Sequence, residues 1–316
     1  MKVLITGGSG FVGSHLTDRL LADGHSVHVI DNYATGRRDN LKPHAKLEVT
    51  EGTIADAELV NQIFDAFKPE IVVHAAAAYK DPNAWEEDVQ TNIVGSINIV
   101  RASQKCGVKR IIYFQTSLCY GLKPIEQPIT LKHPLFSGES KGGSSYAISK
   151  TGGELYIELS GIDFISFRLA NAYGPRNISG PLPTFFSRLT TGKECFVVDT
   201  RRDFIFIDDL IDVVEKAVHG KGTRGFYHIS TGSDYSIKEL FDETVNALEH
   251  KLEKPVTVKA RGEDDVFTIL IDPSKTEQDF AWKAKTPLKD GVKQAIEYYK
   301  TNGITETFTH LKQANG

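Results

Sequence analysis

Thr6-Gly7-Gly8-Ser9-Gly10-Phe11-Val12-Gly13 directly follows a short apolar run and opens a helical pattern that ends before Gly24. Its glycines fit both G-x-G-x-x-G and the related G-x-x-G-x-x-G. Glycines allow a tight turn in which backbone N–H groups and a helix N-terminus meet a pyrophosphate. In this strand–turn–helix context the motif predicts a dinucleotide site. We expect that site to be formed by Gly7, Gly10, Phe11, Val12 and Gly13.

Asp31 closes the next apolar run, at the distance along the chain where dinucleotide-binding folds place an acidic residue. A carboxylate there accepts hydrogen bonds from ribose hydroxyls and repels a 2′-phosphate, so NAD is favoured over NADP. Arg37 and Arg38 lie nearby and could neutralise a phosphate, but two solvated loop charges are the simpler interpretation.

Outward from this motif, short apolar runs alternate with helical patterns, which predicts βαβ units and a parallel sheet. We expect strands over 3–5, 27–30, 47–49, 71–74, 110–114 and 164–167, and helices over 11–23, 59–67, 85–106 and 146–159. The predicted fold is α/β, a Rossmann-type doubly wound parallel sheet with a smaller C-terminal α/β domain. The expected domains are an NAD-binding domain over 1–174 and a substrate domain over 175–316. Part of 204–217 is a candidate segment that would pack with the NAD-binding domain instead. A Gly/Ser/Lys-rich surface loop is expected over 137–145.

Composition narrows the class of protein. The 316 residues are 40% hydrophobic and carry a net charge of −4, which suits a packed globular protein and offers no basic face for nucleic acid. No apolar run approaches the roughly 20 residues needed to span a bilayer, and the N-terminal run is too short for a signal peptide. We therefore expect a cytoplasmic protein without nucleic-acid or membrane partners.

Neither cysteines nor histidines show metal-ligand spacing. The three cysteines share no close spacing, which favours a reducing compartment over a disulfide framework or a zinc site. Three histidines in the later part of the chain are scattered, so no metal site is predicted. These residues are Cys106, Cys119, Cys195, His219, His228 and His250.

Tyr146 and Lys150 are four residues apart, on one face of a predicted helix. A free tyrosine has a pKa near 10, and a neighbouring ammonium together with the positive nicotinamide would favour its phenolate, moving the pKa toward a useful value for a base. Thr116-Ser117 ends a predicted strand, where open α/β sheets bind ligands. The combination indicates proton transfer at a substrate hydroxyl next to a nicotinamide cofactor.

Across nearly its whole length the chain resembles the extended short-chain dehydrogenase/reductases, in particular the nucleotide-sugar epimerases and dehydratases related to UDP-galactose 4-epimerase. The sequences of its motifs are most similar to those of enzymes from bacterial lipopolysaccharide O-antigen clusters, such as those of Bordetella. The resemblance rests on the glycine turn, Asp31-Asn32, 74–77, Asn92-Ile93-Val94-Gly95, 115–121, 146–150, 168–176, 202–204, Asp208-Asp209 and 272–275 with Trp282.

The resemblance implies a role for each matching residue. Tyr146 would be the acid/base at the sugar hydroxyl, Lys150 would hold the nicotinamide ribose, and Thr116 would bind the reacting oxygen. Cofactor contacts are implied for Asn32, Ala75, Ala76 and Asn92, and contacts to a nucleotide-diphosphate sugar for Ser117, Asn171, Arg202, Arg261 and Asp265. Arg261 is one place off the family position. The family's dimers pair the helices over 85–106 and 146–159, which implies a homodimer.

The residue after Ser117 bears on the reaction. The family's dehydratases carry Asp-Glu and its decarboxylases Ser-Glu where this chain has Ser117-Leu118, and leucine cannot move a proton. C4 epimerisation of a UDP-hexose, UDP-N-acetylhexosamine or UDP-hexuronic acid through a transient 4-keto sugar is the favoured function, for cell-surface polysaccharide synthesis. Dehydration, decarboxylation or 4-keto reduction stay open as alternatives, as does a non-catalytic NAD-binding scaffold. Ile269 stands where some 4-epimerases carry a bulky tyrosine, which leaves room for an N-acetyl group.

Overall fold

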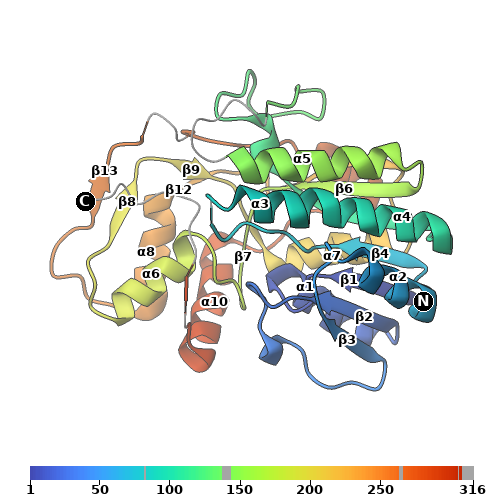
Figure 1. The fold of residues 1–316 in the computed structure, drawn as a ribbon. Helices are drawn as coiled ribbons and strands as arrows, with labels where there is room; N and C mark the ends of the chain where they lie inside the picture. Colours follow the sequence, from blue (N-terminus) through green and yellow to red (C-terminus); the bar gives the residue numbers. More distant parts are fainter. Residues whose placement is uncertain (82, 137–143, 263–265, 305, 308–316) are drawn as a thin grey trace.

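The computed structural model describes residues 1–316 apart from 82, 137–143, 263–265, 305 and 308–316 (Figure 1). Its centre is a seven-stranded sheet in the order β11-β6-β5-β4-β1-β2-β3, in which every neighbouring pair is parallel. This confirms the predicted doubly wound sheet. Most of the loop expected over 137–145 lies outside the described residues.

Six of the seven strands of this sheet begin and end close to the expected runs, whereas β11 was not expected. Within β1, Val3 and Ile5 face one hydrophobic core and Leu4 faces the other, so both faces of the sheet are covered. The strands are β1 (Lys2–Thr6), β2 (Ser26–Asp31), β3 (Leu47–Glu51), β4 (Ile71–His74), β5 (Arg110–Thr116), β6 (Asp163–Leu169) and β11 (Gly225–Ile229).

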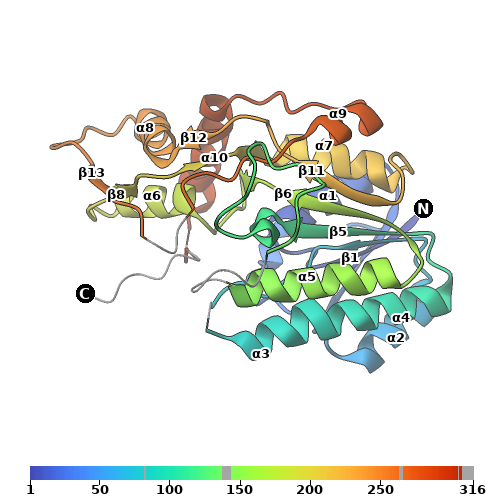
Figure 2. The same cartoon turned by 90° about the horizontal axis from the view of Figure 1, so that it is seen from above.

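Helices cover the two faces unequally (Figure 2). One face carries α2 (Ala57–Phe67), α4 (Ser96–Cys106) and α5 (Ser144–Leu159), and the other carries α1 (Phe11–Ala22) and α7 (Ile207–Val218). Asp56 caps α2, because its carboxylate accepts the N–H groups of Glu58 and Leu59, each at 3.0 Å. None of the helices in the described part of the chain is both long and apolar enough to cross a membrane.

The helix expected over 85–106 is continuous but not uniform. It runs through α3 (Trp85–Asp88), a π-helical segment η2 (Val89–Gly95) and α4. A Cβ atom at Gly95 would lie 2.5 Å from the Ile54 side chain, so the close approach at this point requires glycine. Wide turns of this kind occur often beside functional sites, and here the segment contacts α5, the helix of Tyr146 and Lys150.

The sheet also takes a strand from far along the chain. Residues 225–229 form β11, which pairs with β6, and α7 over 207–218 packs on α1. Arg19 on α1 fixes this packing through ion pairs to Asp212 at 3.0 Å and Glu215 at 2.6 Å. The division into two domains at residue 174 stays a prediction, but the large sheet clearly draws on residues beyond it.

The remaining elements form a smaller α/β region beside the carboxyl ends of the strands (Figure 1). Its helices α6, α8 and α10 pack on one another, and its short strands pair as β7 with β10, β9 with β12 and β8 with β13. The elements are β7 (Asn171–Tyr173), α6 (Pro181–Thr190), β8 (Phe196–Val198), β9 (Arg201–Arg202), β10 (Phe204–Phe206), β12 (Tyr235–Ser236), α8 (Ile237–Leu248), β13 (Thr257–Lys259) and α10 (Leu288–Asn302). Helix α9 (Ser274–Phe280) instead packs on β11 and α7, beside the large sheet (Figure 2).

Candidate active site

A cleft of about 740 Å³ lies at the carboxyl ends of the parallel strands, between the sheet and the smaller region. This is the edge of an open α/β sheet where ligands bind. Most of the predicted site residues line it, although they come from segments far apart in the sequence. They are Gly7, Gly10, Phe11, Val12, Gly13, Asp31, Asn32, Ala75, Ala76, Thr116, Ser117, Tyr146, Lys150, Asn171 and Arg202.

The glycine turn leaves no room for side chains at two of its positions. Gly7 has φ +68°, and a Cβ atom there would lie 2.7 Å from the Ala76 nitrogen. A Cβ atom at Gly13 would lie 2.2 Å from the Gly7 carbonyl oxygen. Helix α1 begins after Gly10 without a side-chain cap and without an acidic residue in its first turn. Its N–H groups therefore face the cleft as an anion site, which fits the pyrophosphate of a dinucleotide.

The next strand brings a carboxylate to the same end of the cleft. Asp31 accepts the N–H groups of Ser9 and Tyr33, each at 2.8 Å, which fixes its side chain against the glycine turn. Burial raises the pKa of Asp31 above its ordinary value, against the effect of these two hydrogen bonds. The placement beside the turn fits a ribose contact. Asn32 lies next to it and accepts the N–H of Ala34 at 3.1 Å.

Tyr146 and Lys150 lie on α5 and both line the cleft. Lys150 is 2% exposed, and its Nζ lies 3.9 Å from the centre of the Tyr113 ring. Burial lowers the pKa of Lys150 to about 7, whereas burial, Tyr79 and Asp88 raise the pKa of Tyr146. Burial therefore opposes the lowering of the Tyr146 pKa that is expected from Lys150 together with a positive nicotinamide. A positively charged ligand in the cleft is needed to favour the phenolate.

The end of β5 supplies two hydroxyl groups. Thr116 is the last residue of β5, and its Oγ1 accepts the N–H of Leu118 at 3.2 Å. The short 3-10 turn η3 (Ser117–Tyr120) follows, with Ser117 7% exposed. Leu118 itself lines the cleft, so an apolar side chain stands directly beside the hydroxyl pair.

Two predicted contacts lie outside the cleft lining and a third outside the described residues. Asn92 is 1% exposed, and its side chain joins the N–H and carbonyl groups of Ala78 to the Ser149 hydroxyl, so it positions the loop after β4 against α5. Arg261 is exposed, with its guanidinium 5.5 Å from the centre of the Phe267 ring. Asp265 falls in the undescribed segment 263–265.

The predicted phosphate ligands lie at the side of the smaller region. Arg202 lines the cleft and donates to the carbonyl oxygens of Arg201 at 2.7 Å and Val266 at 3.0 Å. Asn171 donates to the Asp203 carbonyl at 3.3 Å. Arg202 on β9 and Asn171 on β7 thus bring polar groups of the smaller region to the cleft.

Tyr79 was not predicted as a site residue, although it lines the cleft. Its ring centre lies 6.4 Å from that of Tyr146, in an edge-to-face arrangement. Gln90 and Thr91 line the same wall. The sequence could have indicated Tyr79, because it follows the strand over 71–74, and segments after a strand at the switch point of the sheet commonly contact ligands.

A buried polar network lies behind the catalytic helix. Glu154, one turn after Lys150, accepts from Arg168 at 2.9 and 3.2 Å and from the Ser166 hydroxyl at 2.5 Å. Arg168 also donates to the Tyr120 hydroxyl at 2.9 Å. The side chains of Arg168 and Glu154 are only 5% and 1% exposed, so this ion pair is fully enclosed and links β6 to α5.

Replacing Lys150 with methionine should stabilise the cofactor-free protein by about 1–3 kcal/mol at pH 6.5, because it removes a buried charge. Burial lowers the pKa of Lys150 to about 7, below its unfolded value, so the folded state binds fewer protons than the unfolded state above pH 7. The free-energy cost of burying the Lys150 ammonium is therefore greatest below pH 7 and decreases as the pH rises toward 10. Urea unfolding at pH 6.5 and 9.5 measures both effects.

The exposed helical Lys289 offers a matched control, and Lys289→Met should change the unfolding free energy by less than about 0.5 kcal/mol at either pH. An unfolding free energy for Lys150→Met equal to or below that of the unchanged protein at pH 6.5 would refute the assigned burial cost.

Comparison with known proteins agrees with this geometry. Residues 3–235 match the model of the NAD dependent epimerase/dehydratase family. The crystal structure of Bordetella bronchiseptica WbmH in complex with NAD+ is 50% identical, with a TM-score of 0.92 over 96% of this chain and 99% of that one. Bordetella bronchiseptica WbmG in complex with NAD and UDP is 46% identical, with a TM-score of 0.89 over 98% of both chains. A putative UDP-glucose 4-epimerase of Methanocaldococcus jannaschii is 30% identical over 96% of this chain and 100% of its own length.

Proposed function

The chain belongs to the NAD-dependent epimerase/dehydratase family, and from this membership we propose that it is a UDP-sugar 4-epimerase that recycles NAD in each turnover. One observation carries the proposal. The fold brings Thr116, Tyr146 and Lys150 to the same cleft as the glycine turn and Asp31. When bound, NAD+ supplies a reversible acceptor for the hydrogen at C4 of the sugar.

Tyr146, Thr116 and Lys150 have separate roles in proton transfer. Tyr146 takes the proton of the C4 hydroxyl and later returns it, and Thr116 holds the same oxygen by a hydrogen bond. Lys150, enclosed beside the Tyr113 ring, binds the ribose next to the nicotinamide and adds positive charge near Tyr146. Rotation of the 4-keto sugar between the two half-reactions yields the other epimer.

Leu118 favours epimerisation over the family's other outcomes. Eliminating water from the 4-keto sugar requires an acid or base beside the Thr116–Ser117 pair, and decarboxylation in this family uses a glutamate there. Leu118 lines the cleft at that place, and its side chain can neither donate nor accept a proton. A net 4-keto reductase is the remaining alternative within the family, and Asp31 opposes it where the reductant is NADPH.

The nucleotide end of the substrate is assigned to the smaller region. The structural relative WbmG was crystallised with UDP, and Arg202 and Asn171 line this chain's cleft from the side of the smaller region. Arg202 would meet the diphosphate as a charge-assisted donor. Arg261 is a candidate for a second phosphate contact, and Asp265 is a candidate for another substrate contact. Ile269 lines the cleft and is smaller than tyrosine, which favours a tolerated N-acetyl group.

A panel of UDP-glucose, UDP-N-acetylglucosamine and UDP-glucuronic acid tests the reaction. We expect at least one to give its C4 epimer without added cofactor beyond catalytic NAD, measured by chromatography and NMR of the product. An accumulated 4-keto-6-deoxy or decarboxylated sugar would support the alternative reactions instead. A protein that binds NAD and converts none of the three would favour the non-catalytic scaffold.

A homodimer is part of the proposal, and an exposed apolar face supports it. Along α3, η2 and α5, six large hydrophobic side chains are 43% to 78% exposed, and α5 contacts both of the other segments. A patch of this kind marks an interaction surface more often than a free one. The six residues are Trp85, Val89, Ile148, Leu155, Tyr156 and Leu159. Three unpaired thiols agree with the proposed cytoplasmic location, where the product would serve as a sugar donor for cell-surface polysaccharide.

Leu155→Glu should weaken the dimer by about 30-fold or more in Kd, since it buries a carboxylate at the centre of this face. Sedimentation velocity over a range of concentrations measures the change. Leu252→Glu is a matched control, because Leu252 is similarly exposed, at 41%, but lies on another surface. A Leu155→Glu protein that sediments like the unchanged one would exclude this face as the interface.

A further inference from the structure

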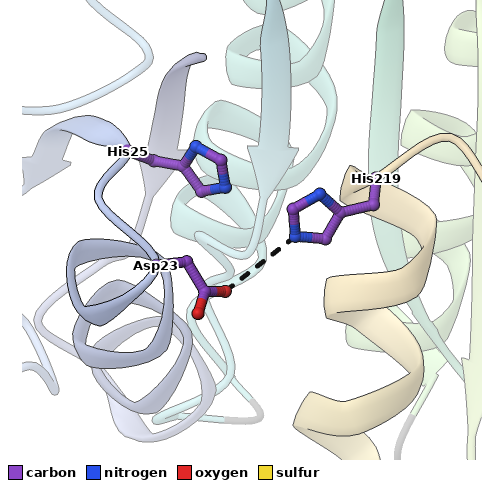
Figure 3. A group of neighbouring side chains, drawn as sticks. All are labelled: Asp23, His25 and His219. Atoms are coloured by element: carbon purple, nitrogen blue, oxygen red, sulfur yellow. Dashed lines mark ion pairs between the residues drawn. The ribbon is translucent and has the colours of Figure 1, made fainter.

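Three potential metal ligands meet at the edge of the sheet opposite the cleft. Asp23 follows α1 as its C-cap, His25 precedes β2, and His219 is the C-cap of α7. Their ligand atoms all lie within 4.8 Å of one another. Figure 3 shows the two imidazole rings and the carboxylate turned toward one shared space. Sequence spacing does not reveal this group, because His219 comes from an element far along the chain.

The backbone positions of the three residues are held by packing. Helices α1 and α7 contact each other, and Arg19 joins them through Asp212 and Glu215. The His219 Nε2 lies 3.9 Å from the Asp23 Oδ2, and the two imidazole centroids are 5.2 Å apart. Only side-chain rotations separate this arrangement from a coordination sphere.

The ring nitrogen of His25 that faces the group is available for a ligand. Its Nδ1 lies 3.2 Å from the Met1 nitrogen, whereas its Nε2 is buried and has no hydrogen-bond partner in the described part of the chain. Buried polar atoms without partners are uncommon in folded proteins.

The local charges also favour a cation. The Asp23 carboxylate faces the space between the two histidines, 3.9 Å from the His219 Nε2, where a divalent ion would offset its charge (Figure 3). The nearby Glu215 carboxylate is already paired with Arg19 at 2.6 Å. Lys46, whose Nζ donates to the Gly24 carbonyl at 2.8 Å, and the Met1 amino group oppose this attraction.

We propose that Asp23, His25 and His219 bind one divalent transition-metal ion, with zinc as the best fit, and that the ion ties α7 to the turn between α1 and β2. Two imidazole nitrogens and one carboxylate oxygen, completed by water, form a tetrahedral zinc set. Zinc–nitrogen bonds of about 2.0–2.1 Å place such ligands about 3.3 Å apart, so ligand atoms that now lie within 4.8 Å of one another must approach by up to about 1.5 Å. The ion lies at the opposite edge of the sheet from Tyr146, so its role is structural.

Zinc titration of the tag-free, full-length protein after chelator treatment and dialysis tests the site. We expect one zinc per chain by calorimetry, and a rise in Tm of about 3 °C or more at a zinc concentration near 100 times Kd. Magnesium should not compete, since it prefers oxygen ligands. Sugar turnover should be the same with and without the ion.

Variants separate this site from adventitious binding by surface histidines. His219→Asn and His25→Asn should each raise the zinc Kd at least about tenfold, whereas His219→Cys, which offers a thiolate, should retain binding. His250→Asn, at another exposed histidine, is the matched control and should bind like the unchanged protein. Equal zinc affinity in His219→Asn, or no stoichiometric zinc binding in the unchanged protein, would overturn the proposal.

Cobalt(II) binding keeps the test independent of variant folding. In the unchanged protein, cobalt should give the intense visible bands of four-coordinate geometry, and zinc should displace it. Only the weak spectrum of six-coordinate cobalt would overturn the assignment of a protein-built tetrahedral site.

Discussion

Replacing Tyr146 with phenylalanine lowers kcat for sugar epimerisation by about 10²- to 10⁴-fold and leaves NAD binding nearly unchanged. The substitution removes only the hydroxyl that exchanges a proton with the C4 oxygen, while the ring stays beside Tyr79 in the cleft. Steady-state kinetics with a converted UDP-sugar, together with fluorescence titration of NAD, measure both quantities.

Tyr156→Phe is the matched control for this prediction, because Tyr156 lies on the same helix but outside the cleft lining. Its kcat should stay within about twofold of the unchanged enzyme. If Tyr146→Phe kept full turnover, the proton would have to travel through another group and the assignment of Tyr146 would be wrong.

Replacing Arg168 with methionine should lower the free energy of unfolding by about 3–5 kcal/mol, since it leaves the enclosed Glu154 carboxylate without its cation. The guanidinium also donates to the Tyr120 hydroxyl and lies 4.5 Å from the centre of the Phe226 ring, so packing is lost with the charge. Urea unfolding followed by circular dichroism and by tryptophan fluorescence measures the loss.

Arg224→Met provides the control for Arg168→Met. Arg224 lies 4.7 Å from the centre of the Phe164 ring in a comparable aromatic contact, but it is exposed, so its loss should cost less than about 1 kcal/mol. Adding Glu154→Leu to Arg168→Met should recover part of the stability, because an apolar pair leaves no buried charge uncompensated. A loss below about 1 kcal/mol in Arg168→Met alone would mean that Glu154 finds another partner.

Local sequence patterns sufficed for six sheet strands, because most are short apolar runs between a turn and a helical pattern and β3 alternates apolar with polar residues. They did not predict β11, whose run Gly225–Ile229 includes a buried histidine that pairs with the Tyr120 hydroxyl at 2.6 Å. They also did not predict the π-helical segment η2, because its geometry depends on how Gly95 packs against Ile54 and on contacts with α5.

The candidate site followed from the sequence wherever a residue stands at the end of a strand or on the α5 face. Thr116, Asp31 and Lys150 are of this kind, and the structure brings them to one cleft. The direction of the Tyr146 pKa shift could not be predicted, because it depends on how completely the surrounding chain excludes water. The grouping of His219 with His25 likewise depends on the packing of α7 against α1.

The central claim is that hydrogen leaves C4 of a UDP-hexose and returns to the opposite face of the same carbon within one cleft. The most direct measurement uses the best-converted UDP-hexose with deuterium at C4, followed by NMR and mass spectrometry of the product. The account predicts a C4 epimer that retains the deuterium at C4, with no net consumption of NAD. Loss of the deuterium to solvent, or an accumulated keto or dehydrated sugar in place of the epimer, would contradict it.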